Sequence, residues 1–442
     1  MVRVVVIGGG FGGMAAAARL AKLGHAVTLV EANDRLGGAL TPVTQDGFTW
    51  DGGPDMTLLP AVVRDLFRKS GRPLERELDL EPVEVIREHR FEDRTRVQMT
   101  GGSRAAQIEA FDRLGKGLGR QWVDFVASFA ADWEVLRQHY FEVPWTPDAL
   151  PRDVAARLDG REMLARRIRR TFKDRRLRLV AGFPAEAEGH NPRDVPAWTG
   201  LVHYLEQRFG AWTVPGGMYQ MADVLTQRLE TRKVTVLTGT TVTDVVVRGG
   251  RVAAIAVSGP DGDRELETEV AVSAIDPRRL PITARYADRT MPAMPPQIVH
   301  LGLEDAPELP AAEVVLHGDP LLVVRRGAAD PNAWTVHARG KLLEDVTIAL
   351  ARHKIDVRDR VVSRVDLGPR ELVGRWGGSP YGLLWMGRTT TRRRLGPTTP
   401  IPGLYAAGAH ATPGAGLPFV GLSAALVAQA ITTDTGGGDL RA

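Results

Sequence analysis

The sequence predicts an α/β protein of two domains, one of them organised around a strand–helix–strand unit at its start. With 442 residues, the chain is longer than one ordinary hydrophobic core accommodates. An apolar, β-branched run begins at Val2 and stops at a glycine cluster, residues 8–13. A helical pattern over 14–23 and a second apolar run over 26–30 follow. That order is the βαβ unit of nucleotide-binding domains.

The glycine cluster has the spacing of a phosphate-binding turn. Gly8 permits the tight turn, Gly10 lets backbone approach a pyrophosphate, and Gly13 lets the helix pack close to the strand. The positive end of the helix then points at the phosphates. Glu31, about twenty residues beyond the loop, ends the second strand, where a carboxylate accepts both ribose hydroxyls. A 2′-phosphate would meet like charge there, which disfavours NADP.

The residues after Glu31 separate the two remaining cofactors, FAD and NAD. Glu31-Ala32-Asn33-Asp34-Arg35-Leu36-Gly37-Gly38 resembles the extension seen in two-domain FAD enzymes of the glutathione reductase and amine oxidase type. In those enzymes the arginine and the paired glycines add pyrophosphate contacts. The resemblance therefore favours FAD.

Composition limits the class of protein. Apolar and charged fractions of 43% and 25% are those of a soluble globular chain. The Cys count of 0 excludes disulfides, thiolate metal sites, a redox dithiol and a cysteinyl-linked flavin. A net charge of +4 is small for this length and gives no support to nucleic-acid binding. Because the first strand begins at Val2, no cleavable signal fits before it, and we expect a cytoplasmic enzyme.

One region has the length and composition of a membrane span. No Asp, Glu, Lys or Arg occurs from Leu395 to Thr433. Prolines and glycines interrupt it, however, and lipid would leave such backbone without hydrogen-bond partners. We expect its helical part, about Gly421 to Ile431, to be too short to cross a bilayer. The sequence therefore predicts no transmembrane segment.

The next part of the chain reads as a loop, a helix and short strands, followed by a helical region. Residues 49–56 form a turn-rich loop, 61–69 a helix, and 83–86 and 96–99 strands. From 104 to 178 the pattern is mostly helical. Within it one apolar stripe recurs at three- and four-residue spacing and predicts a core-facing helix. The stripe consists of Trp122, Phe125, Val126, Phe129, Trp133 and Leu136.

Residues 152–178 carry a run of arginines and lysines with apolar residues among them. A solvated helix face is the simpler interpretation and is slightly favoured. The alternative is an interfacial helix on anionic lipid, because cationic groups beside apolar anchors suit that boundary. The second interpretation predicts peripheral association with a membrane surface.

The middle of the chain predicts a return to the nucleotide domain. A turn at 213–220 feeds a helix that ends near 230, and 234–237 is a strand. Residues 241–247 and 252–257 alternate around Arg248-Gly249-Gly250-Arg251, which predicts a hairpin, and a third run covers 270–275. In FAD enzymes a three-strand return of this kind rejoins the nucleotide domain.

Four further strands, at 298–303, 314–317, 321–325 and 334–338, suit an antiparallel sheet of a substrate domain. His300, His317 and His337 lie in or beside them. No paired base or metal-ligand spacing accompanies these histidines, so they are interpreted as structural. A helix is expected over about 341–353.

The last informative stretch, residues 403–421, reads as a strand, a glycine-rich loop and a helix of small residues. A second helix N-terminus therefore points at something anionic. Two such elements at opposite ends of one chain are natural when FAD lies across the domain, with one loop at the ADP half and the other at the flavin half. The hypothesis requires residues 408–418 to lie beside the 8–13 turn.

Taken together, these motifs resemble the phytoene desaturase family of bacterial carotenoid enzymes, within the wider flavin amine oxidase superfamily. The resemblance covers most of the chain, and Gly408-Ala409-His410 with Pro413-Gly414-Ala415-Gly416-Leu417-Pro418 is its most specific part. The remaining motifs are the N-terminal turn, the 51–55 loop, Trp212–Gly217, Ala274–Pro277 and Gly377–Gly382.

The resemblance implies a two-domain FAD-binding Rossmann-type fold with a mixed substrate domain of sheet and helices. The FAD domain would comprise 1–80, 213–280 and 395–442, and the substrate domain 81–212 and 281–394, with a helical part around 104–178. It also implies a set of FAD contacts: Gly8, Gly10, Phe11, Gly12, Gly13, Glu31, Ala32, Arg35, Gly38, Ala39, Gly53, Pro54, Asp55, Met56, Val242, Gly408, Ala409, Leu417, Pro418 and Val420.

The function implied is an FAD-dependent desaturase that removes hydride and proton from a hydrophobic, isoprenoid-type small molecule. The family binds long polyenes in a tunnel and associates with membranes from the surface. Alternatives are a flavin oxidase of a small amine or secondary metabolite, a flavin-dependent isomerase or reductase, and a binding module that keeps the fold. The sequence assigns no catalytic residue and no metal site; Asp55, His337 and Arg388 are candidate catalytic groups. It leaves oligomeric state and electron acceptor open.

Overall fold

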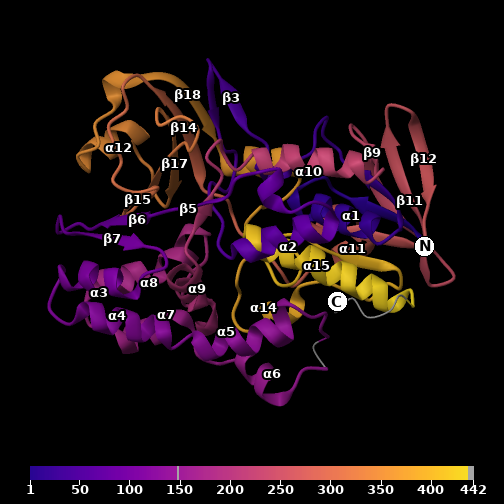
Figure 1. Ribbon diagram of the computed structural model, residues 1–442, viewed down its shortest axis with the longest axis horizontal. Helices are drawn as coiled ribbons and strands as arrows, with labels where there is room; N and C mark the ends of the chain where they lie inside the picture. Colours follow the sequence, from indigo (N-terminus) through magenta and orange to yellow (C-terminus); the bar gives the residue numbers. More distant parts are fainter. Residues whose placement is uncertain (147–148, 437–442) are drawn as a thin grey trace.

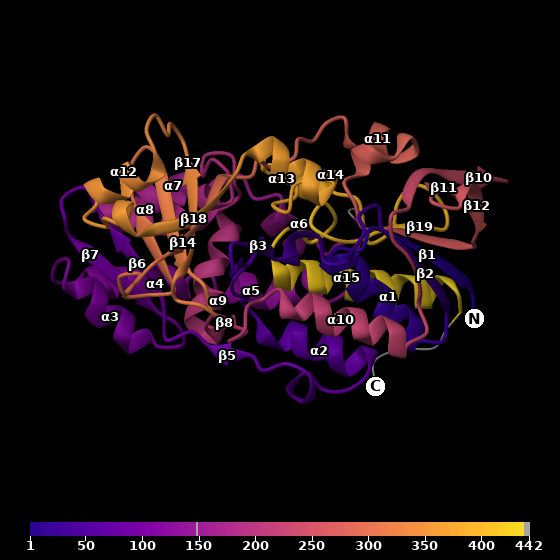
Figure 2. The same ribbon diagram turned by 90° about the horizontal axis from the view of Figure 1, so that it is seen from above.

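The computed structural model describes residues 1–146 and 149–436. Within them the chain forms a five-stranded, a three-stranded and a seven-stranded sheet together with two short ribbons. In both views the five-stranded sheet and its helices lie at the end that holds the N-terminus, and the seven-stranded sheet lies at the other end (Figure 1, Figure 2). The fold is therefore mixed α/β, as the sequence predicts.

The five-stranded sheet is parallel throughout, with strand order β19-β13-β1-β2-β9. Its strands are largely apolar runs because both faces are covered, one by helices and the other by the three-stranded sheet. The strands come from distant parts of the chain. Of the segment 395–442 that is predicted for the FAD domain, residues 437–442 lie outside the described residues. The strands are β1 (Arg3–Ile7), β2 (Ala26–Val30), β9 (Thr235–Leu237), β13 (Val270–Ser273) and β19 (Leu404–Ala406).

Four helices pack beside this sheet. They are α1 (Phe11–Lys22), α2 (Pro60–Ser70), α10 (Gln220–Thr231) and α15 (Leu417–Asp434). Figures 1 and 2 both show the N-terminal α1 lying along the C-terminal α15. The two ends of the chain thus share one core, which includes Met14, Ala424 and Val427.

The prediction that the C-terminal helix is limited to 421–431 is wrong. The helix begins at Leu417, because Pro418 falls in the first turn, where a missing N–H costs no hydrogen bond. Within the described residues, α15 is long and apolar enough to cross a membrane, yet 67% of it is buried inside the protein. The apolar face that would meet lipid is used to contact α1 and α2.

The three-stranded sheet corrects the predicted return. Strands β10 (Thr241–Arg248) and β11 (Arg251–Gly259) form the expected hairpin. Their third partner is β12 (Gly262–Glu267), a mostly exposed, charged strand without an apolar pattern to reveal it. The 270–275 run becomes β13 in the parallel sheet instead.

The seven-stranded sheet has the order β18-β14-β17-β16-β15-β6-β7. The expectation of a purely antiparallel sheet is wrong at one pair, because β15 and β6 run parallel. Helix α12 (Val346–Arg352) covers one of its faces with an apolar core. Its strands are β6 (Val85–Arg90), β7 (Arg96–Thr100), β14 (Gln297–Leu303), β15 (Glu313–Leu316), β16 (Leu321–Arg326), β17 (Ala333–Arg339) and β18 (Val361–Leu367).

A helical layer lies beside this sheet (Figure 1). The predicted apolar stripe is buried as expected, although it continues over two helices, α4 and α5, rather than one. The basic segment 152–178 forms three helices or parts of helices instead of one. The helices of the layer are α3 (Arg104–Asp112), α4 (Leu118–Ala127), α5 (Ala130–Leu136), α6 (Arg152–Leu158), α7 (Leu164–Thr171), α8 (Arg175–Ala187) and α9 (Leu201–Phe209).

Short elements connect these layers. Ribbons β3 (Val43–Gln45) with β4 (Phe48–Trp50) and β5 (Glu81–Pro82) with β8 (Trp212–Thr213) link the two ends of the molecule. The remaining helices are α11 (Pro281–Ala287), α13 (Pro369–Trp376) and α14 (Thr390–Arg393).

Candidate active site

A single hollow of about 390 Å³ runs from the first β-turn–helix junction to the seven-stranded sheet. Its lining comes from both ends of the molecule: the 8–12 turn and residues 408–420 on one side, and strands β6, β15, β16 and β17 on the other. Cofactor-sized space and substrate-sized space are therefore continuous. Clefts between domains are common sites for small-molecule ligands.

The turn between β1 and α1 is built by glycine. Gly8 has φ of 98°, in the region that side chains disfavour, and a Cβ on Gly13 would lie 1.8 Å from the Gly8 carbonyl oxygen. Gly10 is different, because a Cβ there would meet no protein atom closer than 3.9 Å and Gly10 lines the cavity. The open space beside Gly10 is what a closely approaching phosphate needs.

The two glycine-rich ends of the chain meet at this turn. A Cβ on Gly12 would lie 2.9 Å from the Cα of Gly408 and 3.0 Å from Val420. Gly408 follows β19, which lies in the same parallel sheet as β1, one strand beyond β13. The requirement that residues 408–418 lie beside the 8–13 turn is met. We call Gly8, Gly10, Gly12, Gly38 and Gly408 the glycine wall.

Glu31 is a buried carboxylate at the end of β2. Its Oε2 accepts a hydrogen bond from the Gly9 N–H at 2.6 Å, and its Oε1 accepts from the Asn33 N–H and side-chain amide at 2.8 Å. These donors fix the side chain at the cavity edge. Oε2 keeps one acceptor site, so a hydroxyl group of a ligand can still be bound.

Most of the residues predicted to contact the cofactor line this hollow. Four do not. Gly13 packs behind the turn, and Ala32 lies outside the lining. Arg35 faces Asp223 at 4.0 Å with half of its side chain exposed, and Val242 packs against the core of the three-stranded sheet. Those that do are Gly8, Gly10, Phe11, Gly12, Glu31, Gly38, Ala39, Gly53, Pro54, Asp55, Met56, Gly408, Ala409, Leu417, Pro418 and Val420.

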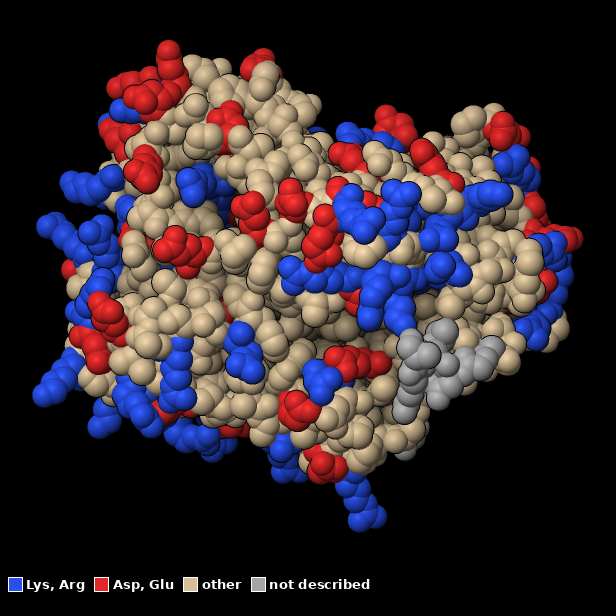
Figure 3. Space-filling view, viewed as in Figure 1, with Lys and Arg blue, Asp and Glu red and all other residues tan. Residues whose placement is uncertain are grey.

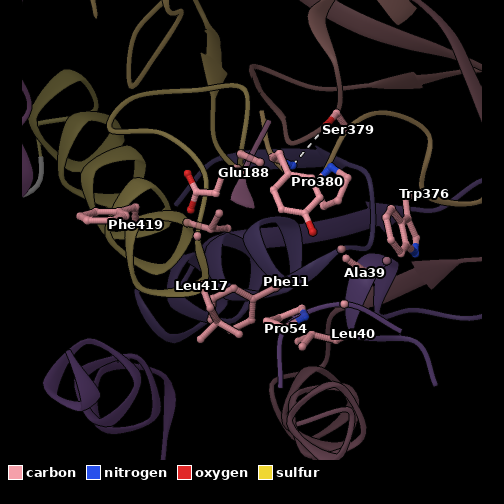
Figure 4. Close-up of a pocket in the computed structure, with 18 of the residues that line it drawn as sticks. Phe11, Ala39, Leu40, Pro54, Glu188, Trp376, Ser379, Pro380, Leu417 and Phe419 are labelled. Carbon is pink, nitrogen blue, oxygen red and sulfur yellow. Dashed lines mark hydrogen bonds between the residues drawn. The ribbon is translucent and has the colours of Figure 1, made fainter. Parts of the chain in front are cut away.

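A second loop, which follows α13, closes the cavity. Residues 376–381 line it, although the sequence analysis used this stretch only as a family motif and assigned it no contact. The Ser379 hydroxyl accepts a hydrogen bond from the Tyr381 N–H at 3.2 Å, the dashed line in Figure 4. Figure 4 shows Trp376 and Pro380 from this loop around the same pocket as Phe11 and Pro54.

The opposite side of the cavity is one face of the seven-stranded sheet. Register places Arg87, Glu313 and Arg325 in one row across β6, β15 and β16. His337 and Arg339 follow on the same face of β17. All five line the cavity, and we call them the charged wall. The other face of these strands carries apolar residues.

Ion pairs link most of the charged wall. Arg87 Nε donates to Glu313 Oε2 at 2.7 Å, and Arg325 Nε donates to Glu313 Oε1 at 2.8 Å. Arg87 NH1 also donates to Glu206 of α9 at 3.1 Å, and Arg325 NH1 lies 3.4 Å from Asp55. These side chains are largely removed from water, so each charge depends on its partner.

The network shifts the pKa values of its carboxyl groups in different directions. Burial alone would raise the pKa of Glu206, but the charge of Arg87 outweighs it and lowers that pKa to about 2. Burial raises the pKa of Asp55, and the more distant Arg325 opposes this only in part. Asp55 is thus the more easily protonated member of the network.

A smaller cluster surrounds the end of α8. Arg339 Nε donates to the Ala187 carbonyl at 2.6 Å, its NH1 donates to the Met294 carbonyl at 2.7 Å, and its guanidinium lies over the Tyr381 ring. Desolvation lowers the pKa of Arg339. Glu188, the residue directly after α8, projects into the cavity beside this group.

The candidate catalytic groups and the three histidines lie in different surroundings. Asp55 and His337 line the cavity, whereas Arg388 is exposed and contacts the Asp159 carbonyl at 3.5 Å. His317 bonds His89 at 2.9 Å, and His300 bonds the Thr335 hydroxyl at 3.0 Å. Burial lowers the pKa of His337 well below its usual value.

Apart from His337, the residues of the charged wall were not predicted from the sequence, and neither was Glu188. Arg87 lies among other charged residues of β6, and Glu313 and Arg325 lie at or next to a strand end, where charged side chains are usually solvated, so none of the three indicated a covered face. Glu188 did give a signal. It ends a helix directly before Gly189, where the helix dipole disfavours a negative charge.

Comparisons with known proteins agree with this geometry. The family model described as flavin containing amine oxidoreductase matches residues 11–432. The chain is 26% identical to a 4,4'-diapolycopene oxygenase of Methylomonas sp. and 27% identical to a hydroxyneurosporene desaturase of Cereibacter sphaeroides, in each case over 98% of both chains. Cyclohexylamine oxidase from Brevibacterium oxydans superimposes with a TM-score of 0.66 at 18% identity, over 97% of this chain and 99% of that one. That last likeness concerns the fold.

Proposed function

The chain belongs to the flavin-containing amine oxidoreductase family, and from that premise we propose that it is an FAD-dependent oxidoreductase of the phytoene desaturase type. The substrate class proposed is a hydrophobic, isoprenoid-derived polyene that loses a hydride and a proton from neighbouring carbons. The full-length likeness to proteins named for carotenoid substrates supports this class. The observation that carries the proposal is the single hollow in which the glycine wall faces substrate-sized space.

The residues present fit FAD. We propose that the glycines of the wall before Gly408 hold the pyrophosphate with the N-terminus of α1, that Glu31 binds the ribose, and that residues 408–420 contact the flavin half. Gly10 supports the first assignment because its free side faces the cavity. When bound, FAD supplies the two-electron acceptor for the substrate. On the same grounds we propose the domain division 1–80, 213–280 and 395–442 against 81–212 and 281–394.

The remaining lining has the properties that such a reaction needs from the protein. Ile298, Leu321 and Val323 interrupt the charged wall with apolar surface, and Phe183 and Phe419 face the cavity from α8 and α15. These side chains would orient an apolar substrate and exclude water from it. Dehydrogenation of a carbon chain requires both.

The charged wall favours a second candidate, a flavin oxidase of a small amine or polar secondary metabolite. A purely hydrocarbon substrate gains nothing from buried Arg87, Glu313 and Arg325, and burying such charges is costly. Aromatic residues and carboxyl groups together line the hollow, which is the arrangement expected for an amine substrate. The two candidates differ in substrate and share the cofactor.

The basic segment supports a proposal about location. We propose a cytoplasmic protein that contacts a membrane surface through residues 152–178. Lysine and arginine side chains are numerous along the lower left of Figure 3, where Figure 1 places α3, α4 and α7. Within residues 152–178, some arginines are already paired, among them Arg170 with Glu162 at 2.7 Å and Arg175 with Glu92 at 3.1 Å. The attraction to anionic lipid is therefore smaller than the sequence alone indicates.

Anaerobic reduction of the flavin tests the proposal. The purified protein is mixed without oxygen with phytoene-like lipids in detergent and, separately, with a panel of amines. Loss of the yellow colour with the lipids supports the desaturase. Reduction by amines alone contradicts it and supports the second candidate.

A further inference from the structure

The cavity contains one carboxyl group that differs from all the others lining it. Among the described residues, Glu188 accepts no hydrogen bond and lies within ion-pair distance only of His190, whose Nε2 is 3.7 Å from it. In Figure 4 its carboxyl projects into the space between Phe419 and Pro380, and no dashed line reaches it. Its side chain is 47% exposed, and that surface faces the hollow.

Every other carboxyl group lining the cavity has a fixed partner. Glu313 and Glu206 pair with Arg87, Asp55 lies 3.4 Å from Arg325, and Asp276 pairs with Arg278 at 2.9 Å. Glu31 is held by Gly9 and Asn33 through the bonds described above. A carboxylate bound in this way is a poor proton acceptor, because taking up a proton breaks its charge-assisted bonds.

The groups that face Glu188 allow its carboxyl to exchange a proton near neutral pH. Burial raises its pKa to about 7, against the opposing charges of Arg339 on β17 and Arg394 after α14. Burial and the same arginines lower the pKa of His190 to about 3, so this neighbour stays neutral. Burial raises the pKa of Tyr381, which therefore stays protonated.

Backbone geometry fixes Glu188 in this position. Gly189, with φ of 85°, ends α8, and the His190 N–H donates to the Ala185 carbonyl at 2.8 Å. This is the bond pattern of a glycine-terminated helix. Arg339 packs against the same turn, since a Cβ on Gly189 would lie 2.6 Å from its NH1. The carboxyl is thus presented by a rigid helix end.

We propose that Glu188 is the proton acceptor of this enzyme, an inference that rests on the proposed function. One C–H bond of the substrate breaks and its proton passes to Glu188 Oε, which becomes a neutral carboxyl. The electron pair left on that carbon would form the new C=C bond while the neighbouring carbon gives up a hydride, for which FAD, when bound, would supply the two-electron acceptor. The substrate is oxidised by two electrons and the cofactor is reduced by two.

The test compares Glu188→Gln with Glu186→Gln. Glu186 also has a raised pKa, from burial, but it lines a separate surface pocket beside α7, so it is a matched control. Anaerobic flavin reduction by the active substrate is followed in a stopped-flow instrument from pH 5 to 9. For wild type and Glu186→Gln we expect the limiting rate to rise with pH through about 7.

In Glu188→Gln the limiting rate should fall about 10²- to 10⁴-fold, as expected when a general base is lost, and become independent of pH. The substrate dissociation constant, measured from the change in flavin absorbance on mixing, should stay within about threefold because the variant is isosteric. Glu188→Asp should restore part of the rate and the pH dependence.

A measurement without turnover is made on the same proteins. Infrared difference spectra across pH 5–9 should show a protonated carboxyl disappearing near pH 7 in wild type and Glu186→Gln and absent in Glu188→Gln. A wild-type rate and pH profile in Glu188→Gln, or the same infrared change in all three proteins, would overturn the inference. A wild-type flavin that no lipid or amine reduces contradicts the proposed function instead.

Discussion

The two sides of the cavity differ in which part of the polypeptide lines them: glycine backbone on one side and charged side chains on the other. The glycine wall consists of residues that have no side chain, so phosphate-sized space remains beside the N-terminus of α1. The charged wall consists mainly of ionised arginine and glutamate side chains on a sheet whose other face is an apolar core. The glycine wall depends on backbone shape, and the charged wall depends on balanced buried charge. We therefore expect substitutions in the two walls to have different effects on folding and binding.

The difference explains why one cavity can hold a constant cofactor and a variable substrate. Gly8, Gly12 and Gly38 leave no room for a larger residue, because a Cβ there would lie 2.9 Å or closer to a neighbouring atom, whereas Gly10 borders open space. Charged side chains can be exchanged in pairs when a substrate requires it, as long as the net charge is preserved. We therefore expect the choice of substrate to depend on the charged wall more than on the glycine wall.

The largest expected effect is that of Gly13→Ala, directly behind the glycine wall. The new Cβ would lie 1.8 Å from the Gly8 carbonyl oxygen, and neither backbone segment can move without distorting β1 or α1. We expect loss of folded protein, or destabilisation above about 4 kcal/mol. Thermal melting followed by circular dichroism checks this, and a melting temperature close to wild type would show that the turn adapts.

Glu313→Gln should have the next largest effect, now on the charged wall. Glu313 is 3% exposed and lies between Arg87 and Arg325, so its neutral form leaves two buried cations facing each other. We expect a loss of about 3–5 kcal/mol in urea unfolding. The control is Glu267→Gln, since Glu267 pairs with Arg3 on the surface and should matter by less than about 1 kcal/mol. Equal losses in both variants would contradict a buried network.

Gly10→Ala separates binding from folding. Gly10 has φ of −70°, which alanine adopts freely, and its Cβ would meet only the open cavity. We expect the apo-protein to melt as wild type does while flavin binds at least about tenfold more weakly, a cost of about 1.4 kcal/mol. Equilibrium dialysis against the cofactor measures this. Retention of wild-type affinity would remove Gly10 from the proposed phosphate site.

The smallest effect concerns pH and His337. Its folded pKa lies well below 6.5, so below pH 6.5 the unfolded chain binds a proton that the folded protein does not. The contribution of His337 to the free energy of unfolding is therefore fully present above pH 6.5. It falls as the pH drops, by about 1.4 kcal/mol per pH unit.

Urea unfolding of wild type and His337→Gln between pH 8 and 5 measures that slope. The variant should lose stability less steeply on acidification. Val336→Ala, one residue away on the apolar face, should lower stability equally at every pH and serves as the control. Parallel curves for wild type and His337→Gln would contradict a neutral buried His337.

Several features could be predicted from the sequence because they are local. The Gly8–Gly13 turn, the helix after it and Glu31 are specified by residues close together in the chain, where backbone sterics and helix capping act directly. The approach of Gly12 to Gly408 could also be foreseen, since two anion-binding helix ends in one chain have a single plausible ligand between them. These features needed no knowledge of the packing.

Tertiary structure alone decided the other side of the cavity. Whether a charged residue in a strand faces water or a covered cavity depends on what packs over the sheet, and for Arg87, Glu313 and Arg325 that cover comes from residues more than a hundred positions away. Glu188 likewise became a free cavity carboxyl only because its helix ends against β17 and the loop at 376–381. Short-range pattern cannot encode burial that a distant segment supplies, because burial is a property of the assembled layers.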